Sequence, residues 1–258
     1  MTSEAGSKIQ QLLANWPNGA VFTSAALKKQ GYSDALLYHY RKSGWLTGVG
    51  RGAFAKAGDP IDWRGGLYAL QEQWKLPVHL GGKSALTYGG AAHFLNMGTE
   101  TVTLFASPAT RLPGWYTHHD WRVKVTLIMT NLFPDDVGLT SETIGSFSIR
   151  ISSRERAMFE TLYLAPKDQS LSEARLLMEG LTNLRPKLLQ QLLESCSSIK
   201  VKRLFMLFAE ELKLGWSKRL DPGKVDFGIG DRTIVKGGKL HHKYRVTLPA
   251  DLFEESNR

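Results

Sequence analysis

Apolar and polar positions follow a helical period through residues 21–42 of the chain, and a hairpin pattern comes directly after them. Thr23 and Ser33 precede two predicted helices, because a hydroxyl at that position can accept a hydrogen bond from a free backbone N–H. Gly31 supplies the turn between the helices, since glycine adopts a positive φ without strain. The second helix is expected to bury one side, formed by Leu36, Leu37 and Tyr40.

The hairpin pattern occupies residues 45–56, where two short strands flank Gly50-Arg51-Gly52. A cation therefore lies at the predicted tip, and its glycine neighbours leave room for the backbone to approach DNA closely. The order helix, turn, helix and basic hairpin is typical of a winged helix-turn-helix, whose second helix enters the DNA major groove. The hairpin of that motif, the wing, can reach phosphates or the adjacent minor groove.

The outward-facing side chains of this motif form the candidate DNA-binding site. Arg41 and Lys42 suit phosphate contacts, whereas Tyr38 and His39 are better candidates for base edges. Residues 1–58 hold seven Lys and Arg against two acids, which favours a phosphate-facing module. A small helical domain that docks a protein through a solvated basic face is the alternative. The full candidate set is Lys28, Lys29, Ser33, Asp34, Tyr38, His39, Arg41, Lys42 and Arg51.

The remainder of the chain, residues 59–258, predicts a larger mixed domain. Alternating β-branched segments at about residues 100–151 predict a small sheet. Apolar stripes predict a helical region at about residues 152–214, and the glycine-punctuated end predicts a hairpin. The expected fold class is α+β, with an N-terminal winged helix-turn-helix, residues 1–58, ahead of a larger mixed α/β domain.

Two helices of the larger domain begin at recognisable signals. Ser152 with Glu155, and Ser170 with Glu173, match capping boxes, in which the serine hydroxyl accepts from the backbone N–H three residues on. Further helices are predicted at residues 6–16, 62–75, 83–94 and 199–214.

The formal net charge of the 258 residues is +9, and the basic excess lies at the two ends of the chain. Residues 199–258 hold thirteen Lys and Arg against eight acids. We expect Lys200, Lys202 and Arg203 to contribute to a second basic surface with a binding role of its own. The alternative for this charge is the solvated face of a scaffold.

No motif predicts catalysis, a metal or a cofactor. His118-His119 and His241-His242 are adjacent pairs, and adjacent side chains on a strand point to opposite faces. Gly228-Ile229-Gly230 lacks the third glycine of a dinucleotide fingerprint.

The single cysteine, Cys196, excludes an internal disulfide and suits a reducing compartment. Neither a secretory signal nor an apolar run of about eighteen residues is found, so we expect a cytoplasmic protein without a membrane partner.

Three stretches of the chain resemble the AbiEi family, antitoxins and repressors of type IV abortive-infection toxin–antitoxin systems. The first is GYSDALLYHYRKSGWLTGVGRGAFAKAG, from residue 31, and the second is GGKSALTYGG, from residue 81. The third begins with RLFMLFAEELKLGW, from residue 203, and ends with VDFGIGDRTIVKGGKLHHKYRVTLP, from residue 225. The chain departs from the family on the second helix, where Asp34, Tyr38 and His39 replace a more basic face.

The resemblance implies an N-terminal domain that binds inverted repeats in its own promoter and represses the operon. It also implies a C-terminal domain that counters a nucleotidyltransferase-like toxin without forming a stable complex. The leading hypothesis is therefore a non-enzymatic DNA-binding antitoxin, with Lys200, Lys202 and Arg203 on its antitoxin surface. One alternative is a nuclease-like enzyme that a winged helix targets to nucleic acid. The other is a winged-helix module for protein interaction.

Overall fold

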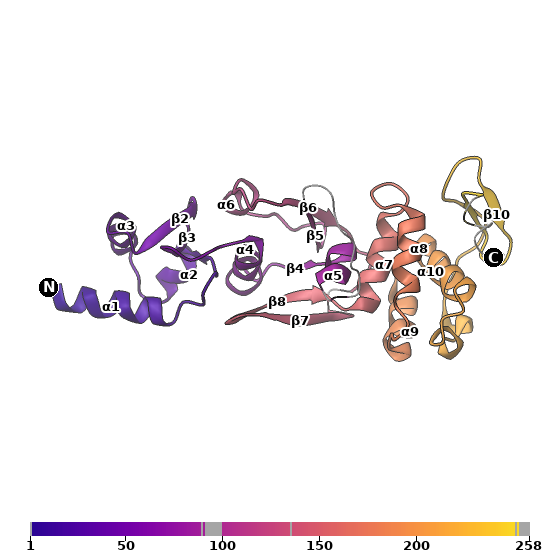
Figure 1. Cartoon of the computed structure of the whole chain (residues 1–258), viewed down its shortest axis with the longest axis horizontal. Coiled ribbons are helices and arrows are strands. Elements are labelled where there is room, and N and C mark those ends of the chain that lie inside the picture. The colour runs from indigo at the N-terminus through magenta and orange to yellow at the C-terminus, as the bar shows by residue number, and fades with distance from the viewer. Residues whose placement is uncertain (1, 89, 91–99, 135, 251, 253–258) are drawn as a thin grey trace. The chain divides into compact units, whose positions relative to one another are not determined.

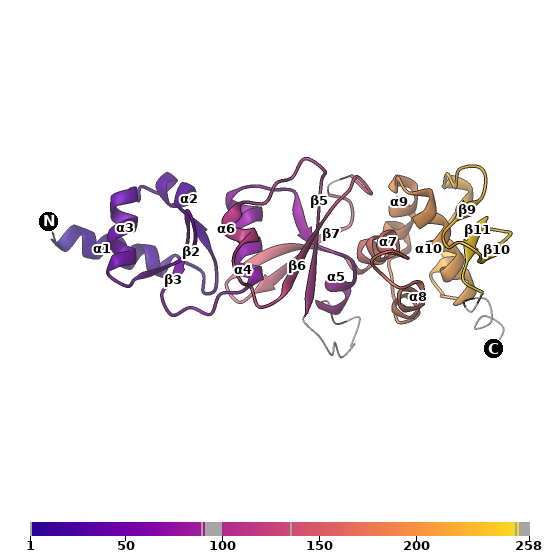
Figure 2. The same cartoon turned by 90° about the horizontal axis from the view of Figure 1, so that it is seen from above.

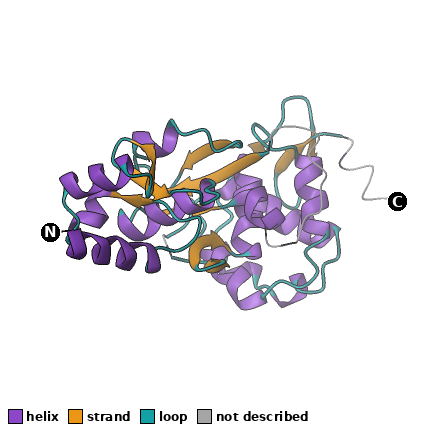
Figure 3. Ribbon diagram, turned by 60° about the vertical axis from the view of Figure 1, so that its left-hand side comes forward, coloured by secondary structure: helices purple, strands orange, loops and turns teal. Residues whose placement is uncertain are grey.

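The computed structural model describes residues 2–88, 90, 100–134, 136–250 and 252. Helices and strands are both abundant (Figure 3), which confirms the α+β fold class. Contacts between residues divide the chain into two units. Unit 1 comprises Met1–His79, Gly98–Met129 and Ser141–Arg150, and unit 2 comprises Leu80–Met97, Thr130–Thr140 and Ile151–Arg258.

Unit 1 begins with helices and short strands in the order of a winged helix-turn-helix (Figure 1). These elements are α1 (Thr2–Ala14), β1 (Phe22–Thr23), α2 (Ser24–Lys29), α3 (Asp34–Lys42), β2 (Leu46–Gly50) and β3 (Ala53–Lys56). Strands β2 and β3 form the wing and pair antiparallel. Strand β1 pairs with the other side of β3, so the sheet order is β1-β3-β2.

The two short helices begin at the caps that the sequence predicts. The Thr23 hydroxyl accepts a hydrogen bond from the backbone N–H of Ala26 at 3.3 Å. The Ser33 hydroxyl accepts one from the backbone N–H of Leu36, also at 3.3 Å. Gly31, in the turn between the helices, has φ +88°, where an L side chain would be strained. These local signals therefore fix where α2 and α3 start.

A five-stranded sheet and short helices form the rest of unit 1, and some strands continue into unit 2. The elements are α4 (Trp63–Tyr68), the π-helix η1 (Ala69–Gln73), β4 (Val78–Leu80), β5 (Thr101–Ala106), α6 (Gly114–Thr117), β6 (Lys124–Met129), β7 (Leu139–Ile144) and β8 (Phe147–Ser152). The strand order is β6-β5-β4-β8-β7. Strands β5 and β6 are parallel, so the chain between them must cross over, and α6 lies in that crossover.

Helix α6 lies beside α4 in both views of unit 1 (Figures 1 and 2). The Tyr116 hydroxyl of α6 donates a hydrogen bond to the Trp63 carbonyl oxygen of α4 at 3.5 Å. Trp121, which follows α6, donates its indole N–H to the Tyr116 carbonyl oxygen at 2.8 Å. An aromatic cluster thus holds the crossover in place.

Unit 2 is mainly helical before its C-terminal strands. Its elements are α5 (Gly82–Tyr88), α7 (Arg154–Leu164), α8 (Leu171–Glu179), α9 (Pro186–Ser195), α10 (Ile199–Glu211), the 3-10 turns η2 (Ser217–Arg219) and η3 (Pro222–Lys224), β9 (Arg232–Thr233), β10 (Lys239–His241) and β11 (Val246–Leu248). Every residue of α10 from 201 to 209 is buried, and Phe205 stacks on Phe159 of α7 with ring centroids 4.1 Å apart. Residues 89 and 91–94 of the helix predicted at 83–94 lie outside the described residues.

The prediction that Ser152 caps a helix is wrong by one residue. Ser153 caps α7, because its hydroxyl accepts from the backbone N–H of Arg156 at 3.4 Å. Ser152 is the last residue of β8, and its hydroxyl donates to Glu160 Oε2 at 2.7 Å. At the second box, Ser170 caps α8 as predicted and accepts from the backbone N–H three residues on, at 3.4 Å.

The chain end forms a three-stranded sheet, with order β10-β11-β9. Strands β10 and β11 pair antiparallel, and β9 adds a short parallel pairing to β11. The sequence predicts a hairpin here but not β9, which contributes two exposed residues only.

Candidate nucleic-acid interface

Helix α3 presents one side to solvent and buries the other. Leu37 and Tyr40 are each 2% exposed, and they fix the helix on its neighbours. Tyr38, between them in sequence, is 67% exposed, which leaves an aromatic ring open for contact. The exposed residues of the cap and helix include Ser33, Asp34, Tyr38, His39, Arg41 and Lys42. The structure thus brings every candidate residue of α3 to solvent, while their contact with DNA stays a prediction.

An ion pair links the two helices of the motif. Lys28 Nζ of α2 lies 2.5 Å from Asp34 Oδ2 of α3, and both side chains are largely exposed. An exposed pair of this kind adds at most about 1 kcal/mol to stability. Its larger effect is on charge, because Asp34 neutralises Lys28, while Lys29 pairs with no described carboxylate.

The wing lies next to the C-terminal part of α3. A Cβ built on Gly48 of β2 would lie 4.0 Å from Arg41 Nε, so the guanidinium of Arg41 extends over the wing strand. Arg51, at the wing tip, is exposed and forms no ion pair with any carboxylate that the structure describes. Both arginines can therefore meet an incoming anion without first breaking a described salt bridge.

Gly50 packs against α6, whereas the lack of a side chain was expected to let DNA approach the wing. A Cβ on Gly50 would lie 2.8 Å from Trp115 Cβ and 2.9 Å from Trp115 Cα, so only glycine fits against α6. The close approach expected here is therefore made to Trp115. Gly52, on the other side of Arg51, has φ +79° and is required by the turn itself.

His119 fastens the wing to the segment after α6. Its Nδ1 donates to the Val49 carbonyl oxygen at 2.9 Å, because a carbonyl can only accept. His118 ends α6 and is exposed. The adjacent histidines thus lie at the end of a helix, whereas the sequence analysis placed them on a strand.

The Gln73 side chain of η1 forms hydrogen bonds with the segment that leads into α2. Its Oε1 accepts from the Thr23 backbone N–H at 2.8 Å and from the Thr23 hydroxyl at 3.1 Å. Its Nε2 donates to the Val21 carbonyl oxygen at 2.8 Å. Gly65 of α4 also accepts, through its carbonyl, from the Val21 N–H at 3.2 Å. The winged helix is thereby tied to residues beyond 58, and the boundary near that residue stays a prediction.

The contacts of Trp115 and His119 with the wing were not predicted from the sequence. The available signal was the aromatic density of the segment WYTHHDW, residues 115–121. Local periodicity gave no hint of its target, because the wing lies far away in the sequence.

The three basic residues of α10 do not form the exposed surface that the sequence analysis expected. Lys202 is 4% exposed and Arg203 is 2% exposed, while Lys200 is half-buried. Burial lowers the pKa of Arg203, and the nearby charges of Arg232 and Arg245 lower it further. The expectation of an open basic patch at these three residues is therefore wrong.

Each of these cations donates to backbone carbonyls. Arg203 donates to four carbonyl oxygens at 2.7–3.1 Å, those of Phe227, Gly228, Gly230 and Arg245. Lys202 donates to the Asp226 carbonyl at 3.0 Å. Lys200 donates to the carbonyls of Tyr163 and Ala165 at 2.7 and 2.5 Å, and burial lowers its pKa. Their observed role is to hold the loop after η3 and the end of α7 against α10.

Three features of the described residues concern metal binding, the cysteine thiol and membrane-spanning length. Within them, no three His, Cys, Asp or Glu side chains gather closely enough to hold a metal ion. Burial raises the pKa of the Cys196 thiol to about 11, so the thiol stays protonated at neutral pH. None of the described helices combines the length and the apolar character needed to span a membrane.

Fold and exposed face together define a class: a winged-helix protein that carries a larger mixed α/β part. A family model described as "Transcriptional regulator, AbiEi antitoxin N-terminal domain" matches residues 5–97. A second model, described as "Transcriptional regulator, AbiEi antitoxin, Type IV TA system", matches residues 99–249. Since the second match alone spans more than half of the chain, this protein belongs to the AbiEi family of type IV toxin–antitoxin systems.

A solved structure shares the fold. The RV2827C protein from Mycobacterium tuberculosis superposes with a TM-score of 0.63 at 15% sequence identity. The match covers 98% of this chain and 94% of that chain. At this identity the likeness concerns the fold alone. No curated protein matches the chain.

Proposed function

We propose that this protein is a DNA-binding antitoxin that represses its own operon and counteracts a nucleotidyltransferase-like toxin in the cytoplasm. One observation carries the DNA-binding part: α3 and the wing together expose Tyr38, His39, Arg41, Lys42 and Arg51. Membership of a family of transcriptional regulator antitoxins supports the same role.

The dimensions of α3 suit the major groove. The helix has nine residues, about 14 Å of length at 1.5 Å per residue, and the groove is about 12 Å wide. Arg41 and Lys42 would contact phosphates, and Tyr38 and His39 would contact base edges. The wing would follow the DNA backbone with Arg51, which comes directly after Gly50, the glycine that packs against Trp115. Lys28, Lys29, Ser33 and Asp34 would lie at the approach of the two helices to the backbone.

Promoter footprinting tests the repressor role. DNA from the upstream region of its own gene is incubated with the whole chain, and protection is compared with that of a shuffled fragment of equal length. Protected inverted repeats and a decrease in reporter expression are expected. Equal affinity for the shuffled fragment would mean that the protein binds DNA phosphates without sequence preference. It would reject the proposal that α3 recognises an operator sequence.

We assign the antitoxin role to residues 59–258. We propose that this part of the chain neutralises the toxin without catalysing a reaction. It is tested by co-expression with the toxin of the same locus. Cell growth should be restored, and affinity purification under the same conditions should recover no stable antitoxin–toxin complex. Growth arrest despite folded antitoxin would reject the role.

A further inference from the structure

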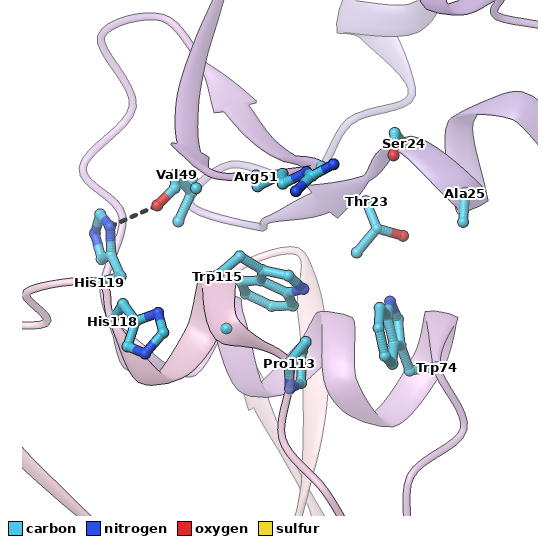
Figure 4. Close-up of a pocket in the computed structure, with 13 residues that line it drawn as sticks. Thr23, Ser24, Ala25, Val49, Arg51, Trp74, Pro113, Trp115, His118 and His119 are labelled. Atoms are coloured by element: carbon cyan, nitrogen blue, oxygen red, sulfur yellow. Dashed lines mark hydrogen bonds between the residues drawn. The ribbon is translucent and has the colours of Figure 1, made fainter.

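A cavity of about 510 Å³ opens between the wing, the start of α2, the end of η1 and α6 (Figure 4). This volume is typical of sites for drug-sized organic ligands. All of its walls belong to unit 1. It is lined by Thr23, Ser24, Ala25, Val49, Gly50, Arg51, Gly52, Trp74, Pro113, Gly114, Trp115, His118 and His119.

The Trp115 side chain brings an unused hydrogen-bond donor to this cavity. Trp115 is 5% exposed, and its Nε1 has no hydrogen-bond partner among the residues that the structure describes. Figure 4 shows the nitrogen edge of this indole turned toward the side of the cavity where Trp74 stands. A buried N–H without an acceptor costs stability, so such a group calls for a ligand or a function.

Other buried tryptophans of the chain show what is normal here. The indole N–H of Trp16 donates to the Ala20 carbonyl at 2.9 Å, and that of Trp121 donates to the Tyr116 carbonyl at 2.8 Å. The indole N–H of Trp216 donates to a carbonyl oxygen at 2.7 Å. Trp115, which lines the cavity, departs from this pattern, because its indole N–H has no acceptor among the described residues.

The charge of the cavity favours an anion. Arg51 lines it and forms no ion pair with a described carboxylate, and none of the lining residues is Asp or Glu. Ser24 adds a hydroxyl group at the same rim (Figure 4). An anionic group placed near Arg51 would therefore meet a guanidinium and no opposing acid.

The walls of the cavity favour a flat ring. Trp74 is 44% exposed, and Figure 4 shows its ring standing across from Trp115, with Pro113 below them. Exposed indoles stack well on heteroaromatic bases, whatever the base. A ring with acceptor atoms at its edge would also satisfy Trp115 Nε1.

We propose that this cavity binds a planar aromatic anion, and that its occupant is a mononucleotide. The base stacks on Trp74 and accepts a hydrogen bond from Trp115 Nε1, and the phosphate pairs with Arg51. Because the proposed function places Arg51 on the DNA backbone, a bound nucleotide withdraws this cation from DNA. This second step rests on the proposed function, whereas nucleotide binding does not.

Isothermal titration calorimetry on the whole chain tests the binding step, with AMP and GMP as probes. Ribose 5-phosphate, inorganic phosphate and salicylate separate the contributions of base, phosphate and a simple aromatic carboxylate. One site per chain is expected, with AMP or GMP bound at least about tenfold more tightly than inorganic phosphate, since stacking adds to charge. Tighter binding of salicylate than of either nucleotide would assign the site to aromatic carboxylates and overturn the nucleotide.

Three substitutions locate the site. Trp74→Ala and Arg51→Ala should each weaken nucleotide binding about tenfold or more, through lost stacking and lost charge. Trp115→Phe keeps a ring against Gly50 but removes the N–H, and should weaken binding about threefold to tenfold. Trp45→Ala, which removes another half-exposed indole, and Lys8→Ala, which removes an exposed cation of α1, are the controls. No heat of binding, or equal losses in variants and controls, overturns the site.

Fluorescence anisotropy with labelled operator DNA tests the second step. Saturating AMP or GMP should weaken DNA binding by the wild type and have no effect on Arg51→Ala. Nucleotide binding with unchanged DNA affinity rejects the coupling alone. If the chain binds no promoter DNA, the proposed function fails, while calorimetry still decides whether the cavity binds a nucleotide.

Discussion

Arg41 lies exposed on α3, its Nε next to the wing strand at Gly48. We expect Arg41→Ala to weaken binding to every DNA sequence alike, because a phosphate contact carries no base information. The slope of log K against log salt concentration should become shallower by about one ion. Anisotropy over a salt series measures this slope, with Lys8→Ala as the control. An unchanged slope would remove Arg41 from the phosphate contacts.

Arg203 shows how a charge count can mislead. Its side chain is 2% exposed and donates to four backbone carbonyls, so Arg203→Ala leaves several buried acceptors without donors. Each such group costs about 1–3 kcal/mol, and we expect the free energy of unfolding to fall by about 3 kcal/mol or more. Urea denaturation followed by circular dichroism measures the loss, and the exposed Lys236→Ala is the control. A loss no larger than that of the control would mean that Arg203 reaches solvent after all.

Glu155 couples stability to acid pH. Burial alone would raise the pKa of its carboxyl, but hydrogen bonds from the Arg185 side chain and backbone, each 2.9 Å long, bring the pKa down to about 2. A carboxyl with a lowered folded-state pKa contributes stability that is complete above its ordinary pKa and disappears as the pH falls through the folded value.

Glu155→Gln is therefore expected to be less stable than the wild type at pH 7, by a difference on the order of 2 kcal/mol once solvent screening at the exposed Arg185 is allowed for. The difference should shrink between pH 4.5 and pH 2, the interval set by the two pKa values. Unfolding free energies measured across this interval test the coupling, with the exposed Glu179→Gln as control. A difference that stays constant with pH would show that the carboxylate is not held by Arg185.

Among the elements, the wing depends on a glycine contact that can be tested with a matched pair. A Cβ at Gly50 would come within 3 Å of Trp115 Cα and Cβ, whereas at Gly48 it would meet only Arg41 Nε at 4.0 Å. Neither glycine has a positive φ, so alanine is acceptable to the backbone at both. Gly50→Ala should displace the wing and cost about 1–3 kcal/mol of stability, as overpacking does, while Gly48→Ala should stay within about 0.5 kcal/mol. Thermal unfolding compares the two, and equal effects would mean that the wing moves freely against α6.

Elements with a strong local signal were predictable, and those without one were not. Thr23, Ser33 and Ser170 cap helices as predicted, because a cap needs only its own first turn. Strand β7 was not predicted, because its sequence LTSETI is mostly polar and half of its residues are exposed. The alternation of apolar and polar residues that marks a strand is therefore hidden. Helix α6 has four residues, too few for a helical period to show.

At the scale of the whole molecule, the sequence predicted the order of the parts and missed their contacts. The winged helix-turn-helix was readable from periodicity, caps and a turn glycine in one stretch. The contacts of His119 and Trp115 with the wing join segments far apart in the chain, and no spacing rule reports them. Burial of Arg203 was equally hidden, because the carbonyls that satisfy it belong to irregular loops beyond α10.

Repression and protection should be separable within one whole chain. The triple variant Arg41→Ala, Lys42→Ala and Arg51→Ala removes the exposed cations of α3 and the wing tip and leaves residues 59–258 unchanged. It should lose the promoter footprint and reporter repression, because the phosphate contacts provide much of the affinity for DNA. Cells that carry the toxin should still grow, since the proposed antitoxin part is intact.

A charge-matched control separates the site from the net charge. Replacing the exposed Lys167, Lys187 and Lys218 of unit 2 by alanine changes the charge equally and should leave repression intact. Circular dichroism verifies that both proteins are folded. If the folded α3 variant no longer protects cells, DNA binding and neutralisation are one activity; if it still represses, α3 and the wing are not the DNA interface. Only loss of repression together with retained growth supports two separate surfaces in this antitoxin.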